Sequence, residues 1–244
     1  MKLLKNLYLL DGTGHWAPRC NCNVYLLDVG DSFVMIDAGH EKNLPYALDT
    51  MKYCGLSPEK ITHVLITHSH LDHSGAAAAL REMGVKVVAC GSDADGIEAG
   101  DERIGTYFCT DDVFRPSKVD IKVKDGDKLT FGDLEIEVIN APGHTEGGAI
   151  YRCMLEGKEA MFTGDTVLNP VFYTGGGNNP VIYGGLGWAG SIDFDRAAYT
   201  QTLKRLWHDY KPEMLFPAHH AMTFTNGHLW IGHALNYVLE FWRK

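Results

Sequence analysis

Three histidines and one aspartate occupy six consecutive positions, His68-Ser69-His70-Leu71-Asp72-His73. Imidazole nitrogens and carboxylate oxygens are common ligands of divalent metal ions. In a strand, His68, His70 and Asp72 would share one face while His73 pointed away. In a helix, only His68 with Asp72 and His70 with His73 would lie on a common face. We therefore predict a turning loop that directs its ligands toward two cations, about 3.5 to 4 Å apart as in two-metal sites.

Candidate strands and helices alternate along the chain in two series. A short apolar strand leads into the histidine cluster, and a helix with Ser74 as its N-cap follows the cluster. Residues 91–120 have no clean period and are predicted to be an irregular insertion. The predicted strands are 23–27, 33–36, 64–67, 85–89, 128–131, 134–139, 149–151, 160–162 and 214–216, and the predicted helices are 44–54, 75–83, 197–207 and 228–242. This order predicts an α/β fold with two sheets inside and helices outside, formed by residues 1–244 as a single domain.

Three further candidate ligands each follow a predicted strand. His144 comes after the strand that ends near Asn140, Asp165 comes after the strand at 160–162, and His219 comes after the strand at 214–216. Small residues before each of them allow the backbone to turn tightly and aim the side chain inward. One such residue alone is a weak signal, but three of them complete the ligand count that the cluster leaves open.

The order and spacing of these motifs resemble the metallo-β-lactamase fold superfamily over nearly the whole chain. The Ile36-Asp37-Ala38-Gly39 segment is similar to the superfamily's early Asp-x-Gly turn, whose aspartate supports the site. The resemblance implies a four-layer αββα sandwich of the metallo-β-lactamase type. It assigns His68, His70 and His144 to one metal, Asp72, His73 and His219 to the other, and Asp165 to the bridge between them. The last motif has Ala218 and His220 where the superfamily usually has glycines, so His220 is the alternative final ligand.

Imidazole and carboxylate ligands without thiolate suit zinc, and also iron or manganese. An aspartate at position 165 with no cysteine near it resembles the glyoxalase II and lactonase branches. A water shared by two zinc ions would supply hydroxide, and Asp72 would accept or relay the proton. Residues 169–193 combine glycines with aromatic side chains and are predicted to cover the substrate, with Tyr173 or Tyr183 donating to the oxyanion.

Composition excludes several classes of partner. A formal net charge of -9 argues against a nucleic-acid surface. The sequence has no stretch that is apolar enough for a signal peptide or membrane span, and its six cysteines show no repeating spacing. We therefore expect reduced thiols, a cytoplasmic location and a small-molecule substrate. Aromatic residues on several faces of the helix at 228–242 raise the possibility of a homodimer.

The primary hypothesis is a dinuclear zinc hydrolase that cleaves a carboxylic ester, lactone or thioester through a metal-bridging hydroxide. The alternatives are a mononuclear iron persulfide dioxygenase and a zinc β-lactamase. A nuclease is disfavoured by the acidic charge balance, and a catalytically inactive scaffold would have no need for seven ligands.

Overall fold

Two β-sheets form the centre of the molecule. The computed structural model describes residues 1–12, 21–108, 113–172, 181–182, 184–187 and 189–242. The first sheet has seven strands in sequential order, antiparallel from β1 to β4 and parallel from β4 to β7. Its strands are β1 (Lys2–Leu4), β2 (Leu7–Asp11), β3 (Val24–Asp28), β4 (Phe33–Ile36), β5 (Ile61–Leu65), β6 (Lys86–Cys90) and β7 (Ile121–Val123).

The second sheet has five strands in the order β14-β11-β10-β9-β8. Its neighbours are antiparallel except β11 and β14, which run parallel. The strands are β8 (Lys128–Phe131), β9 (Leu134–Asn140), β10 (Ala149–Leu155), β11 (Lys158–Gly164) and β14 (Met214–Pro217). A separate two-stranded ribbon joins β12 (Val171–Phe172) to β13 (Val181–Ile182).

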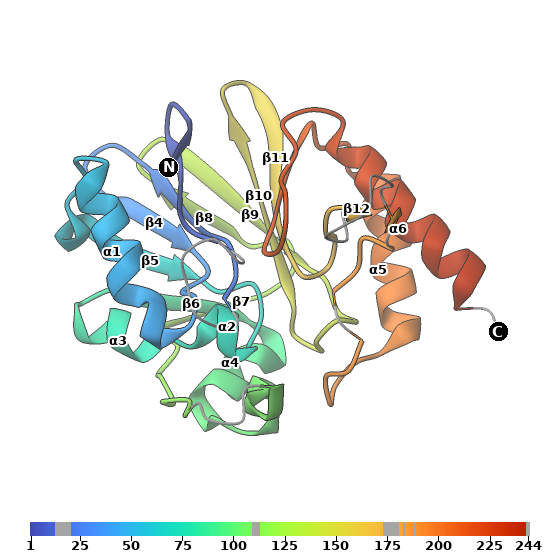
Figure 1. Cartoon of the computed structure of the whole chain (residues 1–244), viewed down its shortest axis with the longest axis horizontal. Coiled ribbons are helices and arrows are strands. Elements are labelled where there is room, and N and C mark those ends of the chain that lie inside the picture. Colours follow the sequence, from blue (N-terminus) through green and yellow to red (C-terminus); the bar gives the residue numbers. More distant parts are fainter. Residues whose placement is uncertain (13–20, 109–112, 173–180, 183, 188, 243–244) are drawn as a thin grey trace.

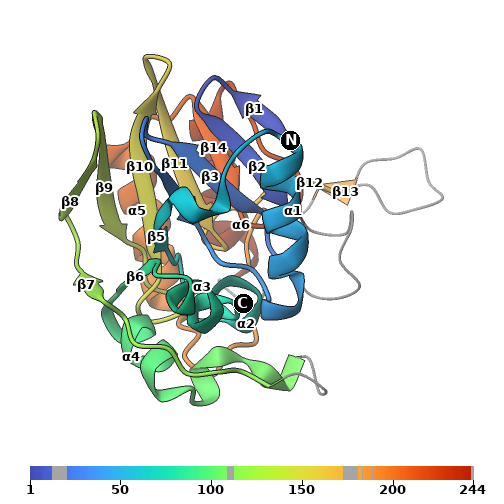
Figure 2. The ribbon, with the colours of Figure 1, turned by 90° about the vertical axis from the view of Figure 1, so that its left-hand side faces the viewer.

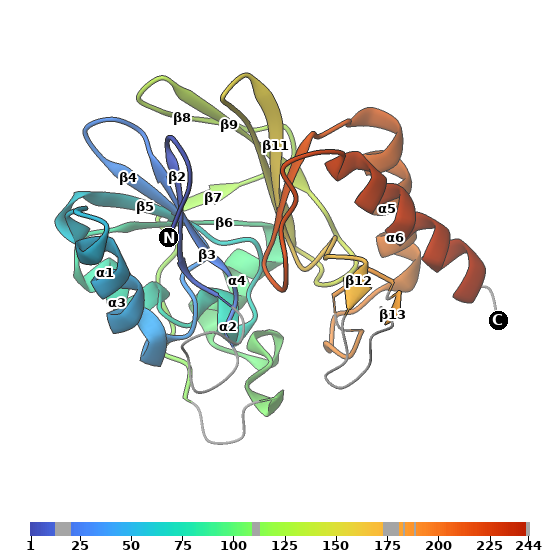
Figure 3. The same ribbon diagram turned by 45° about the horizontal axis from the view of Figure 1, so that its top comes forward.

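Helices cover the outer face of each sheet. On the first sheet they are α1 (Leu44–Tyr53), α2 (Leu71–Ser74), α3 (Ala77–Glu82) and α4 (Gly91–Ala99), and on the second they are α5 (Arg196–Asp209) and α6 (Gly227–Phe241). Figure 1 shows α1 and α3 on one side of the strands and α5 and α6 on the other. Figure 3 shows α5 and α6 side by side.

Three apolar clusters join these layers. One lies between the first sheet and its helices, one between the two sheets, and one between the second sheet and α5 with α6. Between the sheets, the Tyr25 ring packs edge-on against Phe162 and Phe216, with ring centroids 5.4 and 5.7 Å apart. This arrangement confirms the predicted four-layer αββα sandwich.

Two local predictions were wrong: the helix cap at Ser74 and the irregular start of the segment 91–120. Ser74 does not cap a helix, because its hydroxyl donates to the carbonyl oxygens of Ser69 and His70, at 2.6 and 3.1 Å. The helix predicted at 75–83 is present as α3, which begins two residues later because the backbone N–H of Ala76 donates to the carbonyl of Gly39. The short helix α2 before it was not predicted. The predicted irregular insertion begins with a regular helix, α4, which buries Ala94 and Ile97 against the first sheet. Figure 2 shows α2, α3 and α4 gathered at one end of the sandwich.

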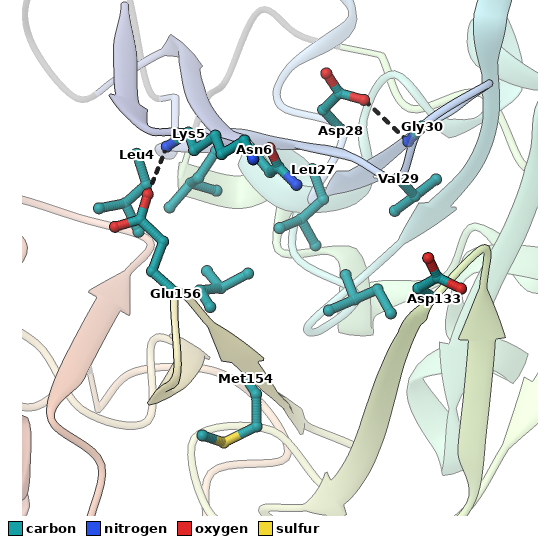
Figure 4. A pocket seen from close by; sticks show the side chains of 13 residues that line it. Leu4, Lys5, Asn6, Leu27, Asp28, Val29, Gly30, Asp133, Met154 and Glu156 are labelled. Atoms are coloured by element: carbon teal, nitrogen blue, oxygen red, sulfur yellow. Dashed lines mark hydrogen bonds between the residues drawn. The ribbon is translucent and has the colours of Figure 1, made fainter.

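A cavity of about 430 Å³ lies at the end of the sandwich where the strands join in hairpin turns. Figure 4 shows it between the β1–β2 turn at Lys5 and the β10–β11 turn at Glu156, with apolar walls that include Leu27 and Met154. Its lining contains none of the predicted metal ligands. Among the described residues, no helix is long and apolar enough to cross a membrane.

Candidate metal centre

The predicted ligands meet at the other end of the sandwich. β5 ends at Leu65, and the following turn carries His68 and His70 before α2 presents Asp72 and His73. In the second sheet, His144 follows the end of β9, Asp165 follows β11, and His219 follows β14. Since β9, β11 and β14 run in the same direction, their ends lie at one edge of that sheet. Two sheets therefore contribute residues to one site.

Three imidazoles form the first candidate group, which we call the first trio: His68, His70 and His144. The Nε2 atom of His68 lies 3.0 Å from Nδ1 of His70, and Nε2 of His144 lies 3.2 Å from each of these two atoms. Tetrahedral zinc with bonds of about 2.0 to 2.1 Å would place neighbouring ligand atoms roughly 3.3 Å apart. The three ring nitrogens therefore have the spacing that one zinc ion requires.

The second trio consists of Asp72, His73 and His219. The Nε2 atom of His219 lies 3.2 Å from Oδ2 of Asp72, and Nε2 of His73 lies 3.5 Å from that same oxygen. Among the described residues, Nε2 of His73 is a buried nitrogen without a hydrogen-bond partner. A cation held by this trio would contact a nitrogen that has no hydrogen-bond partner among the described residues.

Asp165 lies between the two trios. Its Oδ1 is 3.2 Å from Nε2 of His219 and 3.6 Å from Nε2 of His73, whereas its Oδ2 is 3.5 Å from Nε2 of His144. The carboxylate thus directs one oxygen to each trio. This is the arrangement expected of a ligand that bridges two cations.

The two trios differ in electrostatics. Burial lowers the pKa of His144 to about 3 and holds the pKa of His68 well below its ordinary value, so the first trio is neutral and keeps its lone pairs. Burial acts in the same direction on His73, but Asp72, Asp37 and Asp165 outweigh it and raise its pKa to about 9. Asp165 and Asp72 likewise raise the pKa of His219 against the effect of burial. In the second trio, cations would therefore replace protons.

Asp37 and Thr67 orient the ligands from behind. Oδ2 of Asp37 lies 3.0 Å from Nδ1 of His73, which leaves Nε2 of that ring facing the second trio. Oδ1 of Asp37 also accepts from the backbone N–H of Thr67 at 2.7 Å, and the Thr67 hydroxyl lies 3.1 Å from Nδ1 of His68. The early Asp-x-Gly turn therefore supports the site as the resemblance implied.

The structure brings His219 rather than His220 to the site. His220 is exposed and adopts a left-handed backbone conformation with φ of 65°, whereas His219 contacts both Asp72 and Asp165. Tyr173 and Tyr183 lie outside the described residues, so their catalytic roles stay predictions. Cys22 is buried beside Asp37 and His73, and burial keeps the pKa of its thiol far above the usual range, so it stays protonated.

Several supporting residues were missed by the sequence analysis. The hydroxyl of Tyr199, on α5, lies within hydrogen-bond distance of the carbonyl oxygens of Asp165 and Thr166, at 2.9 and 2.8 Å. The hydroxyl of Ser191 donates to the carbonyl of His144 at 2.7 Å. Both are ordinary helix or loop residues in the sequence, and no spacing rule distinguishes them. Their hydrogen bonds fix the turns that carry the ligands.

Gly187 leaves no room for a side chain beside the two trios. A methyl group there would lie 2.5 Å from the carbonyl oxygen of Asp165 and 2.9 Å from Nδ1 of His144. We expect Gly187→Ala to weaken zinc binding at least about 10-fold, because both ligands must move, and to cost roughly 1 to 3 kcal/mol of stability. Zinc titration and thermal unfolding measure the two effects.

Gly55→Ala is the matched control for this substitution. A methyl group at Gly55 meets no atom within 4 Å, although the backbone φ of 76° makes alanine strained there. We expect a loss of about 1 kcal/mol with unchanged zinc affinity. Equal zinc affinities for the Gly187 and Gly55 variants would contradict the close packing described above.

Comparison with known proteins identifies the family. The Metallo-beta-lactamase superfamily matches residues 17–219, which include every candidate ligand. The chain belongs to this superfamily. It is thus a metal-dependent hydrolase with a histidine-rich metal site. An uncharacterised protein of Mycobacterium tuberculosis is 28% identical over 169 residues, which span 65% of this chain and 73% of the relative.

Two relatives with named activities match shorter stretches. An atrochrysone carboxyl ACP thioesterase of a Cryptosporiopsis species is 28% identical over 147 residues, 60% of this chain and 38% of the relative. A hydroxyacylglutathione hydrolase of Brucella abortus is 35% identical over 105 residues, 43% of this chain and 33% of the relative. The matched segments therefore cover little more than a third of these longer proteins.

Solved structures support the fold over the full length. A subclass B3 metallo-beta-lactamase of Bradyrhizobium japonicum superposes with a TM-score of 0.74 at 21% identity, covering 99% of this chain and 91% of that one. A metallo-beta-lactamase of Elizabethkingia meningoseptica gives a TM-score of 0.73 at 17% identity, covering 98% and 89%. At these identities the similarity concerns the fold alone.

Proposed function

We propose that the chain is a dinuclear zinc hydrolase that cleaves a carboxylic ester, lactone or thioester. The observation that carries this proposal is the presence of two separate donor sets with one carboxylate, Asp165, between them. The ligands are proposed as His68, His70 and His144 for one cation and Asp72, His73 and His219 for the other. A mononuclear iron dioxygenase needs fewer ligands, typically two imidazoles and one carboxylate, and would have no need for two donor sets.

Two bound divalent cations would lower the pKa of a shared water from about 15.7 to about 7 and polarise a carbonyl oxygen. The chain's own part is to hold and orient the reacting groups. Asp37 fixes the His73 ring through Nδ1, so that Nε2 stays available as a ligand atom. Burial keeps the first trio neutral at neutral pH, so its nitrogens need not release protons before they bind a cation.

The open side of the site indicates where substrate approaches. The side chain of Asp72 is 22% exposed and that of His219 is 17% exposed, whereas His73 is fully buried. A substrate carbonyl would therefore reach the second trio first, from the side of Asp72. In the proposed mechanism, Asp72 keeps Oδ2 toward the second trio and relays a proton to the leaving group through its other carboxylate oxygen.

The named relatives favour a thioester among the three bond types. Both the thioesterase and the hydroxyacylglutathione hydrolase act on thioesters by name, and their matches span 60% and 43% of this chain. A β-lactam stays an alternative because the similar solved structures are β-lactamases. At 21% and 17% identity, these structures support the fold and favour no particular substrate.

Metal quantification beside a substrate panel tests the proposal. Purified protein is expected to hold two zinc ions per chain and to turn over at least one member of a panel of thioesters, lactones and carboxylic esters. One iron per chain with oxygen uptake in the presence of a persulfide would overturn it in favour of the dioxygenase. Turnover of β-lactams alone would replace the ester substrates with that class.

Dimer formation and a cytoplasmic location stay predictions. Of the aromatic residues on α6, Phe241 is exposed, whereas Trp230, Tyr237 and Trp242 pack partly against the core of the second sheet. Most of the apolar surface that suggested a partner is thus used within the chain. A mass measured by light scattering that does not change with concentration would exclude the dimer.

A further inference from the structure

Asp93 is a buried carboxylate outside both trios. It lies in the first turn of α4, and its residue is 1% exposed. Its Oδ1 accepts from the backbone N–H of Ser69 at 2.7 Å, and its Oδ2 accepts from the hydroxyl of Thr145 at 2.9 Å. A buried carboxylate is costly unless its oxygens accept hydrogen bonds, so these contacts are part of what makes its burial tolerable.

The two donors lie directly beside the first trio. Ser69 separates His68 from His70, and Thr145 follows His144. The turn with Ser69 follows β5 of the first sheet, whereas the turn with Thr145 follows β9 of the second. One side chain therefore connects the two segments that carry all three imidazoles of this trio.

The backbone around this connection is closely packed. A methyl group on Gly147 would lie 2.4 Å from the backbone nitrogen of Asp93 and 2.7 Å from its Oδ2. A methyl group on Gly91, at the start of α4, would lie 3.3 Å from the Cα of Gly147. The first turn of α4 is thus held against the segment that follows His144, and Asp93 has little freedom to move away from its two donors.

Asp93 lies behind the first trio as Asp37 lies behind the second. Asp37 contacts the ring of His73 directly, at 3.0 Å from Nδ1. Among the described residues, the hydrogen bonds of Asp93 go to Ser69 and Thr145 and not to a ligand ring. We propose that Asp93 is a positioning residue that sets the spacing of His68, His70 and His144 and so tunes the affinity of the first trio for zinc.

This inference rests on the proposed function, and two single-trio backgrounds test it separately. His219→Ala disables the second trio, and His144→Ala disables the first. Zinc affinity is measured in each by competition with a chromogenic chelator. We expect Asp93→Ala to weaken zinc binding about 10- to 100-fold in the His219→Ala background and less than about threefold in the His144→Ala background.

Three milder substitutions keep the test decisive if Asp93→Ala does not fold. Asp93→Asn retains an acceptor for the Ser69 N–H, and its amide N–H can donate to the Thr145 hydroxyl oxygen, so it is expected to keep most of the affinity. Thr145→Val removes the hydroxyl and is expected to weaken only the first trio, whereas Thr145→Ser retains the hydroxyl and the affinity. These variants are compared in the same two backgrounds.

Equal losses in both backgrounds would overturn the inference, because a merely structural residue weakens both trios alike. Unchanged affinity of the first trio in Asp93→Ala or Thr145→Val would overturn it as well. Failure of either parent background to bind zinc would instead count against the two-metal function, and with it against any role of Asp93 in that function.

Discussion

Replacing Asp165 with asparagine is expected to reduce bound zinc from two ions per chain to one and turnover by about 1,000-fold or more. The carboxylate has one oxygen 3.5 Å from Nε2 of His144 and the other 3.2 Å from Nε2 of His219, so both candidate ions would share it. Asparagine offers one oxygen and no charge, and it leaves His73 and His219 with less negative charge beside them. A 1,000-fold loss of turnover corresponds to the loss of about 4 kcal/mol of transition-state stabilisation.

The same substitution at Asp195 provides the control. Asp195 is the exposed N-cap of α5, and its carboxylate accepts from the backbone N–H groups of Ala197 and Ala198. Asparagine caps helices as well as aspartate does, so Asp195→Asn should keep two zinc ions and full turnover. Two retained zinc ions and turnover within threefold of the parent in Asp165→Asn would contradict the bridging assignment.

Removal of metal is expected to lower the melting temperature Tm by about 10 to 20 °C relative to protein saturated with zinc. A ligand at about 100 times its Kd stabilises the folded state by about 2.7 kcal/mol per site if the unfolded chain does not bind it. For a chain of this size, 1 kcal/mol shifts Tm by about 2 to 4 °C. Chelator-treated protein titrated with zinc and followed by circular dichroism measures the shift.

Magnesium is the control ion for this experiment. It prefers oxygen ligands in octahedral geometry, whereas five of the seven candidate ligands here are imidazoles, so its effect on Tm should stay below about 3 °C. A His144→Ala/His219→Ala double variant should also lose most of the zinc-dependent shift. Equal shifts with magnesium and zinc, or no shift with zinc, would contradict a site built from these histidines.

The layered fold could be predicted because its strands and helices carry strong local patterns. The strands at Phe33–Ile36 and Lys128–Phe131 have the predicted bounds, and α5 and α6 differ from the predicted helices by one or two residues at their ends. The N-terminal strands β1 and β2 were missed. β7 was also missed, because its three residues, directly after the segment predicted to be irregular, are too few to give a recognisable period.

The ligands could be predicted from the sequence, whereas residues that support them, such as Asp93, could not. His68, His70 and the other candidates stand in motifs whose spacing is itself a signal. Asp93 stands in a segment with two glycines and weak amphipathic character, and its partners Ser69 and Thr145 become visible only when the two sheets are placed together. Long-range hydrogen bonds of this kind leave no pattern in a single sequence.

Anomalous diffraction at the zinc absorption edge, from crystals grown with zinc, tests the central claim most directly. We expect two peaks about 3.5 to 4 Å apart, one about 2.0 to 2.1 Å from the ring nitrogens of His68, His70 and His144 and the other at similar distances from Asp72, His73 and His219. Asp165 would contact both. A single peak, or peaks away from these seven side chains, would contradict it.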